Sequence, residues 1–224
     1  MDLNSLHRKE LVEKLKKAGI KDTEVLKAIG RVKRELFVKE EFKKYSYDNI
    51  ALPLNSNQTI SQPYTVAYMT ELLEIKAGEK ILEIGTGSGY QAAILKELGA
   101  DVYSVERIAE LHLSAKEKLH SLGYNVFLKN DDGTKGWIEH SPFEKIIVTA
   151  GSPKIPKQLL DQLSVGGRMV IPVGDESSQK LMLIKRVKSD EKNSKVPKYR
   201  FKTFEDFKFV PLIGEEGWVY KVKS

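Results

Sequence analysis

The sequence contains no cysteine in its 224 residues, which excludes a disulfide framework, a thiolate metal site and a cysteine nucleophile. No uninterrupted apolar run approaches the roughly 20 residues of a membrane-spanning helix. The first ten residues also lack the apolar core of a signal peptide. We therefore expect a protein that works in the cytoplasm and has no membrane as a partner.

Histidine is scarce as well. The four histidines, His7, His112, His120 and His140, lie in polar surroundings and are not at metal-ligand spacing from one another. None of them forms a recognisable triad pattern with a serine. We predict four solvated histidines, no bound metal and no hydrolase-type serine nucleophile.

Charge of one sign is not in large excess. The chain has 37 lysines and arginines against 31 aspartates and glutamates, a formal net charge of +6, and the two signs are interspersed. This pattern indicates a mixed-charge solvated surface and no nucleic acid as a partner. The basic stretch 185–202 leaves one alternative, a nucleic-acid-binding module, which predicts affinity without any cofactor.

What the sequence does contain, near its middle, is a short apolar run followed by a cluster of glycines, LEIGTGSGY at residues 82–90. Residues 80–84 are typical of a strand, and residues 90–98 place their apolar side chains on one helical face. Glycines in such a turn permit positive φ and close approach of a ligand, and the free N–H groups at the helix start attract negative groups. The stretch therefore predicts a site for a nucleotide-like ligand.

The spacing of these glycines separates the candidate ligands. A dinucleotide fingerprint has G-x-G-x-x-G, whereas this chain has G-x-G-x-G with Glu83 two residues before the first glycine, which disfavours a nicotinamide dehydrogenase. The next expected strand, 101–105, is followed by Glu106, which is placed to accept hydrogen bonds from two ribose hydroxyls. The E-x-G-x-G-x-G form with this downstream acid resembles motif I and its successor in the S-adenosylmethionine-dependent methyltransferases.

Strands and helices are expected to alternate from residue 80 onward, which is typical of a parallel sheet with helices on both faces. The last fifty residues instead predict strands without helices between them, which should pair antiparallel. We predict an α/β, doubly wound, mostly parallel seven-stranded sheet of the methyltransferase-type Rossmann-like class, with an antiparallel C-terminal strand pair. The expected strands are 80–84, 101–105, 125–128, 145–149, 168–173, 180–187 and 204–210, and the expected helices between them are 90–98, 108–122 and 156–163.

The residues before this sheet predict an N-terminal helical extension. Helices are expected at 5–18, at 22–30 with Asp22 as the N-cap, and at 64–73. An aromatic, lysine-rich stretch that we interpret as core and an irregular polar loop at 51–62 lie between them. We divide the chain into residues 1–75, the extension and substrate loop, and residues 76–224, the cofactor-binding catalytic domain, and expect one compact monomeric unit.

Three loops should converge at the carboxyl edge of the sheet, where ligands of such folds bind. They follow Ile84, contain Glu106 and Arg107, and span residues 130–134. In the third loop Asp132 can accept a hydrogen bond from an exocyclic adenine amine while the Gly133 N–H serves a ring nitrogen. The same Asp-Gly pair is equally consistent with a plain turn.

Longer motifs extend the resemblance. NQTISQPY at residues 57–64, LEIGTGSGY, VERI at 105–108, DDGTKGW at 131–137, IIVTAGSPKIP at 146–156 and FVPLIGEEGW at 209–218 occur in the order seen in the protein-L-isoaspartate O-methyltransferases. Motif I alone would also permit a methyltransferase that acts on nucleic acid or on a small molecule. TISQPY and FVPLIGEEGW are the specific pieces, and they argue against that alternative.

The resemblance implies methyl transfer from S-adenosylmethionine, which leaves S-adenosylhomocysteine, to the α-carboxylate of L-isoaspartyl residues in damaged proteins and peptides. It implies that Ser61 is the active-site residue and that Thr59, Val210 and Leu212 lie beside the substrate. The residues that it places at the cofactor are Ile60, Tyr64, Glu83, Gly85, Gly87, Glu106, Arg107, Asp132 and Gly133. Asn57 and Asp131 stand where the family commonly has glycine.

Overall fold

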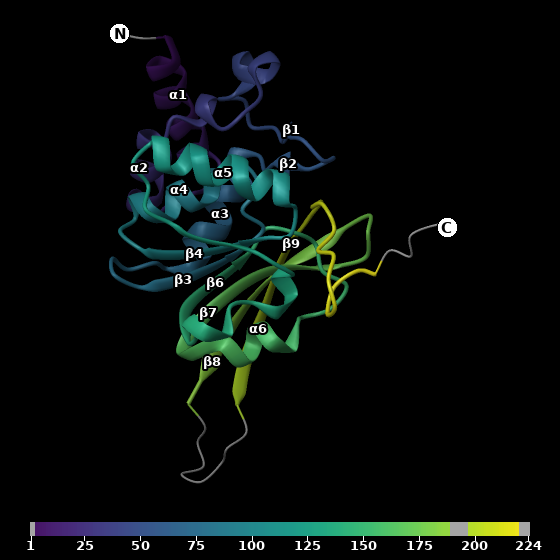
Figure 1. The fold of residues 1–224 in the computed structure, drawn as a ribbon. Helices are drawn as coiled ribbons and strands as arrows, with labels where there is room; N and C mark the ends of the chain where they lie inside the picture. Colours follow the sequence, from purple (N-terminus) through teal and green to yellow (C-terminus); the bar gives the residue numbers. More distant parts are fainter. Residues whose placement is uncertain (1–2, 189–196, 220–224) are drawn as a thin grey trace.

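The seven-stranded sheet predicted from the alternating pattern is present in the computed structural model, which describes residues 3–188 and 197–219 (Figure 1). The strand order is β5-β4-β3-β6-β7-β8-β9. The first five strands in this order are parallel, whereas β8 is antiparallel to both β7 and β9. The strands are β3 (Lys80–Ile84), β4 (Asp101–Glu106), β5 (Phe127–Asn130), β6 (Phe143–Val148), β7 (Leu163–Gly174), β8 (Gln179–Val187) and β9 (Lys198–Phe207).

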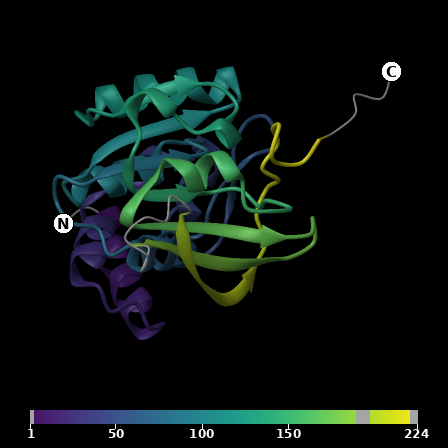
Figure 2. The same cartoon turned by 90° about the horizontal axis from the view of Figure 1, so that it is seen from below.

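Helices cover both faces of this sheet, as Figures 1 and 2 show. One face carries α3 (Pro63–Leu73), α4 (Tyr90–Glu97) and α5 (Ala109–Ser121), and the other carries α6 (Lys157–Gln162). Because strand side chains alternate between faces, Ile81 packs with the first group of helices while Leu82 packs into a separate cluster with Leu159 of α6.

The N-terminal helices α1 (Leu3–Lys17) and α2 (Thr23–Arg31) pack outside α3 and α4. The predicted N-cap is confirmed: the Asp22 side chain accepts hydrogen bonds from the backbone N–H groups of Glu24 and Val25, at 2.9 and 3.2 Å. A cap of this kind stabilises a helix by about 1 kcal/mol. Leu11 of α1 lies in the same hydrophobic cluster as Ile81 of the sheet, so extension and sheet share a core.

Several expected bounds were wrong. β9 begins at Lys198, earlier than the predicted 204–210, because Lys198, Arg200 and Lys202 pair in register with β8 on an edge strand that leaves charged side chains in solvent. β5 begins two residues later than predicted and β6 two residues earlier. The aromatic stretch after α2 forms the 3-10 helices η1 (Arg34–Leu36) and η2 (Glu40–Tyr45), and the loop at 51–62 contains a small hairpin of β1 (Leu52–Pro53) and β2 (Thr59–Ile60).

One histidine also differs from the expectation of solvation. The Nδ1 atom of His112 is buried and has no hydrogen-bond partner in the described part of the chain, and burial lowers the pKa of this imidazole. The reason is its place on α5, whose inner side chains pack against the sheet. Among residues 3–188 and 197–219, no helix combines the length and the apolar composition needed to cross a bilayer.

Candidate active site

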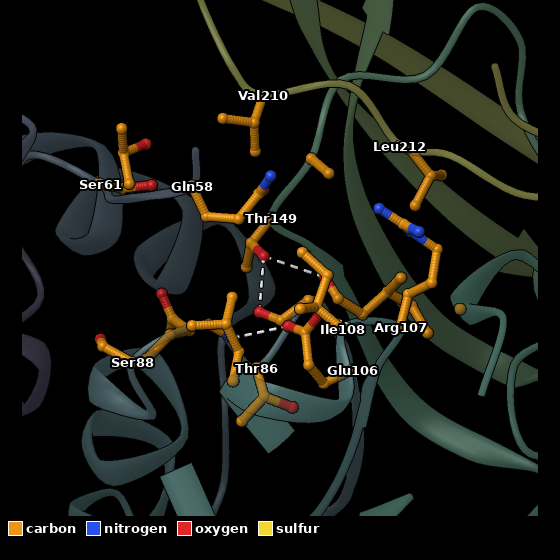
Figure 3. Close-up of a pocket in the computed structure, with 18 of the residues that line it drawn as sticks. Gln58, Ser61, Thr86, Ser88, Glu106, Arg107, Ile108, Thr149, Val210 and Leu212 are labelled. Carbon is orange, nitrogen blue, oxygen red and sulfur yellow. Dashed lines mark hydrogen bonds between the residues drawn. The ribbon is translucent and has the colours of Figure 1, made fainter. Parts of the chain in front are cut away.

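A cavity lies at the carboxyl ends of β3, β4 and β6, where the sequence placed a ligand site (Figure 3). Its walls include the second strand of the β1–β2 hairpin, the glycine-rich loop after β3, the loop after β4, and residues 210–213 near the C-terminus. The residues of the prediction that line it are Thr59, Ile60, Ser61, Gly85, Gly87, Glu106, Arg107, Gly133, Val210 and Leu212.

The glycine-rich loop has the conformation that its sequence predicts. Gly85, Gly87 and Gly89 have φ values of 94°, 53° and 86°, which disfavour any residue with a Cβ. A Cβ at Gly85 would also overlap with the Thr149 hydroxyl, which lies 2.9 Å from the carbonyl oxygen of Ile84 and 2.8 Å from that of Gly85. The first glycine is therefore required both by its own backbone and by the neighbouring strand end.

Glu106 connects two walls of the cavity. Its Oε2 accepts a hydrogen bond from the Gly87 N–H at 2.9 Å, and its Oε1 accepts one from the Ile108 N–H at 2.9 Å (Figure 3). Each carboxylate oxygen has two lone pairs, so both oxygens keep accepting capacity toward the cavity. This placement supports the prediction that Glu106 accepts hydrogen bonds from ribose hydroxyls.

Glu83 lies behind the cavity wall and does not line it. Its side chain is fully buried, and Ser104 Oγ donates a hydrogen bond to its Oε2. The Ser104 hydroxyl is in turn 2.6 Å from the hydroxyl of Thr86, which does line the cavity. Burial raises the pKa of Glu83 to about 8, so the carboxyl is mostly protonated at neutral pH. Glu83 is therefore connected to the cavity only indirectly, through the hydrogen-bonded hydroxyls of Ser104 and Thr86.

Asp132 and Gly133 occupy different places. Gly133 lines the cavity, and a Cβ there would come within 2.5 Å of Ile84 Cγ2. The Asp132 carboxylate is turned to the chain itself: Oδ1 accepts from the backbone N–H and the hydroxyl of Thr134, both at 2.8 Å, and Oδ2 accepts from the Glu215 N–H at 2.8 Å. The interpretation of this pair as a plain turn thus describes part of the role of Asp132, because its carboxylate caps the N-terminus of η3 (Gly133–Lys135).

Ser61 and the segment around Val210 lie on the same side of the cavity in Figure 3, across from Thr86, Ser88 and Glu106. Backbone hydrogen bonds fix this segment, because Gly151 N donates to Val210 O and Leu212 N donates to Gly151 O, both at 2.8 Å. Ile60 and Leu212 are 4% and 6% exposed, so they shield that side from water.

Tyr64 does not line the cavity. Its ring stacks on Tyr68 with centroids 5.7 Å apart, and its backbone N–H donates to Asn49 Oδ1 at 2.8 Å. It lies in the first turn of α3, three residues after Ser61 of the cavity wall.

The backbone conformation of Asn57 explains why asparagine can stand where the family commonly has glycine. Its φ is 55°, a left-handed conformation that glycine adopts freely and asparagine more readily than most other residues. The turn between β1 and β2 therefore keeps its backbone geometry with asparagine in the place of glycine.

Sequence reasoning left several lining residues unassigned. They are Gln58, Val66, Met69, Ile84, Thr86, Ser88, Tyr90, Gln91, Val105, Ile108, Leu111, Thr149, Ala150 and Ile213. Thr149 carried a usable signal, because it directly follows a parallel strand at the edge where ligands bind. Met69 and Leu111 carried none, since their apolar side chains are typical of helix faces in a core. In the described ranges, no group of histidine and acidic residues could hold a metal ion.

Comparison with known proteins gives consistent matches. Residues 6–217 match the family described as protein-L-isoaspartate(D-aspartate) O-methyltransferase. A protein-L-isoaspartate O-methyltransferase of Dictyoglomus turgidum is 52% identical over 212 residues, which cover 94% of this chain and 93% of that protein. One of Christiangramia forsetii is 50% identical over 212 residues, with coverage of 94% and 95%.

Solved structures agree. A protein-L-isoaspartate O-methyltransferase aligns with a TM-score of 0.82 and 31% identity, covering 94% of this chain and 67% of that one. A putative protein-L-isoaspartate O-methyltransferase of Plasmodium falciparum, solved in complex with S-adenosyl-L-homocysteine, aligns with a TM-score of 0.74 and 24% identity, covering 92% and 98%. The second match shows the same fold.

Proposed function

The chain belongs to the protein-L-isoaspartate(D-aspartate) O-methyltransferase family, and from this premise we propose how its cavity performs the family's reaction. The enzyme transfers a methyl group from S-adenosylmethionine to the α-carboxylate of L-isoaspartyl residues in damaged proteins and peptides, which initiates their repair. One observation carries the mechanism: Ser61 lies across one cavity from the glycine-rich loop and Glu106.

The cofactor end of the cavity is the glycine-rich loop with its neighbours. Bound S-adenosylmethionine supplies an electrophilic methyl group on a sulfonium. Gly85 and Gly87 allow the backbone to approach it closely, and Glu106, already fixed by two backbone N–H groups, accepts hydrogen bonds from its ribose. The set that we propose for the cofactor consists of Ile60, Gly85, Gly87, Glu106, Arg107 and Gly133, which line the cavity, and of Tyr64, Glu83 and Asp132, which lie behind its wall and hold lining residues in place.

The substrate end needs no general base. A carboxyl group with a pKa of about 4 is already ionised at neutral pH, but a hydrated carboxylate is a weak nucleophile. The buried Ile60 and Leu212 exclude water, while Thr59 and Val210 flank the isoaspartyl residue. The Ser61 hydroxyl lines the cavity, and there it would donate a hydrogen bond to the substrate carboxylate and fix the orientation of this nucleophile.

We further propose a monomer that works in the cytoplasm, with residues 1–75 and 76–224 as one unit and no nucleic acid as a partner. Basic side chains of the C-terminal strands are engaged in contacts within the chain, which supports the proposal that nucleic acid is not a partner. Arg186 donates to the Leu163 carbonyl at 2.6 Å, Lys180 lies 3.8 Å from Asp206, and the Lys202 ammonium lies 4.9 Å from the Phe204 ring centre. The alternative of a nucleic-acid-binding segment at 185–202 rests partly on residues 189–196, which lie outside the described residues.

The test compares two synthetic peptides that are identical except for L-isoaspartyl or L-aspartyl at one position. With radiolabelled S-adenosylmethionine, we expect base-labile label on the isoaspartyl peptide alone, as a carboxyl methyl ester requires. Label on neither peptide, with cofactor binding intact, would overturn the substrate assignment. It would direct the search to nucleic-acid and small-molecule acceptors.

A further inference from the structure

The β1–β2 hairpin crosses the glycine-rich loop. Its Leu54 Cδ1 lies 3.8 Å from the position that a Cβ of Gly87 would take, so the hairpin rests on the middle of that loop. The return strand then supplies Gln58, Ile60 and Ser61 to the cavity wall. The position of the hairpin therefore determines how far this side of the cavity is closed.

The tip of the hairpin reaches beyond the glycine-rich loop to α5. Asn55 Nδ2 donates to Glu110 Oε1 at 2.7 Å, and Ser56 Oγ donates to Glu110 Oε2 at 2.9 Å. One carboxylate thus accepts hydrogen bonds from two polar side chains of the tip, which are more than fifty residues away in the sequence.

The backbone of the tip holds these two side chains in place. Gln58 N donates to Asn55 O at 3.1 Å, and Leu54 N donates to Gln58 O at 2.8 Å, which closes the turn. Ser56 has a φ of 55°, a left-handed conformation that a turn of this tightness requires. The two donors are therefore pre-arranged to meet one acceptor.

Glu110 does not line the cavity, but its neighbours Ile108 and Leu111 do. It lies in the first turn of α5, four residues after Glu106, whose carboxylate binds the Gly87 N–H. The hairpin and the start of α5 thus approach the cavity from two sides and meet at Glu110.

We propose that Glu110 is a positioning residue that fastens the tip of the β1–β2 hairpin to α5 and so keeps the hairpin closed over the cofactor. This inference rests on the proposed function, because it takes the cavity as the cofactor site. Glu110 itself touches neither cofactor nor substrate. Its role is to slow the release of S-adenosylhomocysteine and to raise the affinity for both forms of the cofactor.

Both hydrogen bonds are exposed, so the expected effect is modest. A net contribution of one or two exposed hydrogen bonds corresponds to a change of about 3- to 10-fold in an equilibrium constant. Because Leu52 and Ile60 keep the hairpin packed in the core when only its tip is released, the thermal midpoint should stay within a few degrees of the wild-type value.

The first experiment measures the dissociation constant and the release rate of S-adenosylhomocysteine for wild type and Glu110→Ala. We expect about 3- to 10-fold weaker binding, faster release and a raised KM for S-adenosylmethionine, with kcat at saturating cofactor unchanged or increased. The matched control is Glu117→Ala, an exposed acid on the same helix, which should behave as wild type. Hydrogen exchange of residues 52–60 should rise in Glu110→Ala alone.

A charge exchange makes the test specific. Asn55→Asp places a second carboxylate against Glu110 and should weaken binding of S-adenosylhomocysteine, whereas Asn55→Asp with Glu110→Gln restores a donor and acceptor pair and should recover most of the affinity. Asn55→Asp is also one product of spontaneous deamidation of the Asn55-Ser56 pair, in which water replaces the amide nitrogen and ammonia leaves.

The experiments distinguish failure of this inference from failure of the proposed function. If wild type binds S-adenosylhomocysteine and Glu110→Ala binds it equally well and releases it equally fast, the role of Glu110 is wrong while the proposed function stands. Failure of the double variant to recover affinity would also overturn the pairing with Asn55. If wild type binds no S-adenosylhomocysteine, the cofactor assignment itself is wrong.

Discussion

The Asp132 carboxylate lies directly against the Cα of Gly214, so that a Cβ at position 214 would overlap with its Oδ1. The neighbouring Glu215 N–H donates to Asp132 Oδ2 at 2.8 Å, and Glu216 N donates to the Thr134 hydroxyl at 3.2 Å. The loop after β5 and the C-terminal segment that supplies Leu212 are therefore fastened together. This contact explains why the first glycine of the GEEG stretch at residues 214–217 cannot carry a side chain.

We expect Gly214→Ala to push the C-terminal segment away from Asp132. Methyl transfer should then fall by about 10-fold or more, because the water-excluding Leu212 moves with the segment. The measurement is kcat/KM on an isoaspartyl peptide together with the thermal midpoint. Gly30→Ala is the matched control, since a Cβ there meets only Val12 Cγ2 at 3.5 Å, and unchanged activity in Gly214→Ala would show that the contact is dispensable.

Replacing Ser61 by alanine should slow methyl transfer without loss of cofactor affinity. Removal of one hydrogen bond to a charged group costs about 1.5–3 kcal/mol, which corresponds to a decrease of about 10- to 150-fold in kcat/KM for the peptide. S-adenosylhomocysteine binding should stay within about twofold of wild type. Ser121→Ala, at the exposed end of α5, serves as the control, and a large loss of cofactor binding in Ser61→Ala would contradict the proposed role.

Glu106→Gln should weaken cofactor binding while leaving the fold intact. The amide nitrogen of glutamine cannot accept a hydrogen bond, so either the Gly87 N–H or the Ile108 N–H loses its acceptor. We expect the dissociation constant of S-adenosylhomocysteine to rise by about 10- to 100-fold. Asp101→Asn, at the exposed start of the same strand, is the control, and equal affinity of both variants would argue against Glu106 as a cofactor residue.

The sheet and the cofactor end of the cavity were predictable because they depend on local patterns. Glycines at 85, 87 and 89 permit the left-handed turn, and Glu106 is the last residue of β4, the strand adjacent to β3. The rule that ligands bind at the carboxyl ends of parallel strands then brings these residues together. Family resemblance added the substrate side, including Ser61 and Val210, which no periodicity indicates.

Other features depend on contacts between distant segments and carry little local signal. Asn55 and Glu110 look like ordinary surface residues until the tip of the hairpin meets α5. The start of β9 was missed because its charged residues are typical of a loop, yet an edge strand keeps them in solvent. Glu83 was placed at the cofactor by its motif, whereas strand alternation puts its side chain on the same face as Ile81, which α3, α4 and α5 cover.

The buried carboxyl of Glu83 should make stability depend on pH. Its pKa is raised from 4.5 to about 8 by burial, so between these values the native state holds a proton that the unfolded chain has lost. The free energy of unfolding therefore decreases as pH rises through this window, by up to about 1.4 kcal/mol per pH unit from this group. The contribution is fully present below about pH 4.5.

Glu83→Gln removes this titration while it keeps the shape of the side chain and an acceptor for the Ser104 hydroxyl. Denaturant unfolding of wild type and variant between pH 5 and pH 9 should show the variant gaining stability relative to wild type up to about pH 8, with a constant difference beyond. Glu117→Gln, which is exposed, should follow the wild-type curve. A difference between Glu83→Gln and wild type that does not change with pH would mean that Glu83 is ionised in the folded protein. Glu83 would then be a carboxylate that accepts a hydrogen bond from the Ser104 hydroxyl, and Ser104 would accept one from Thr86.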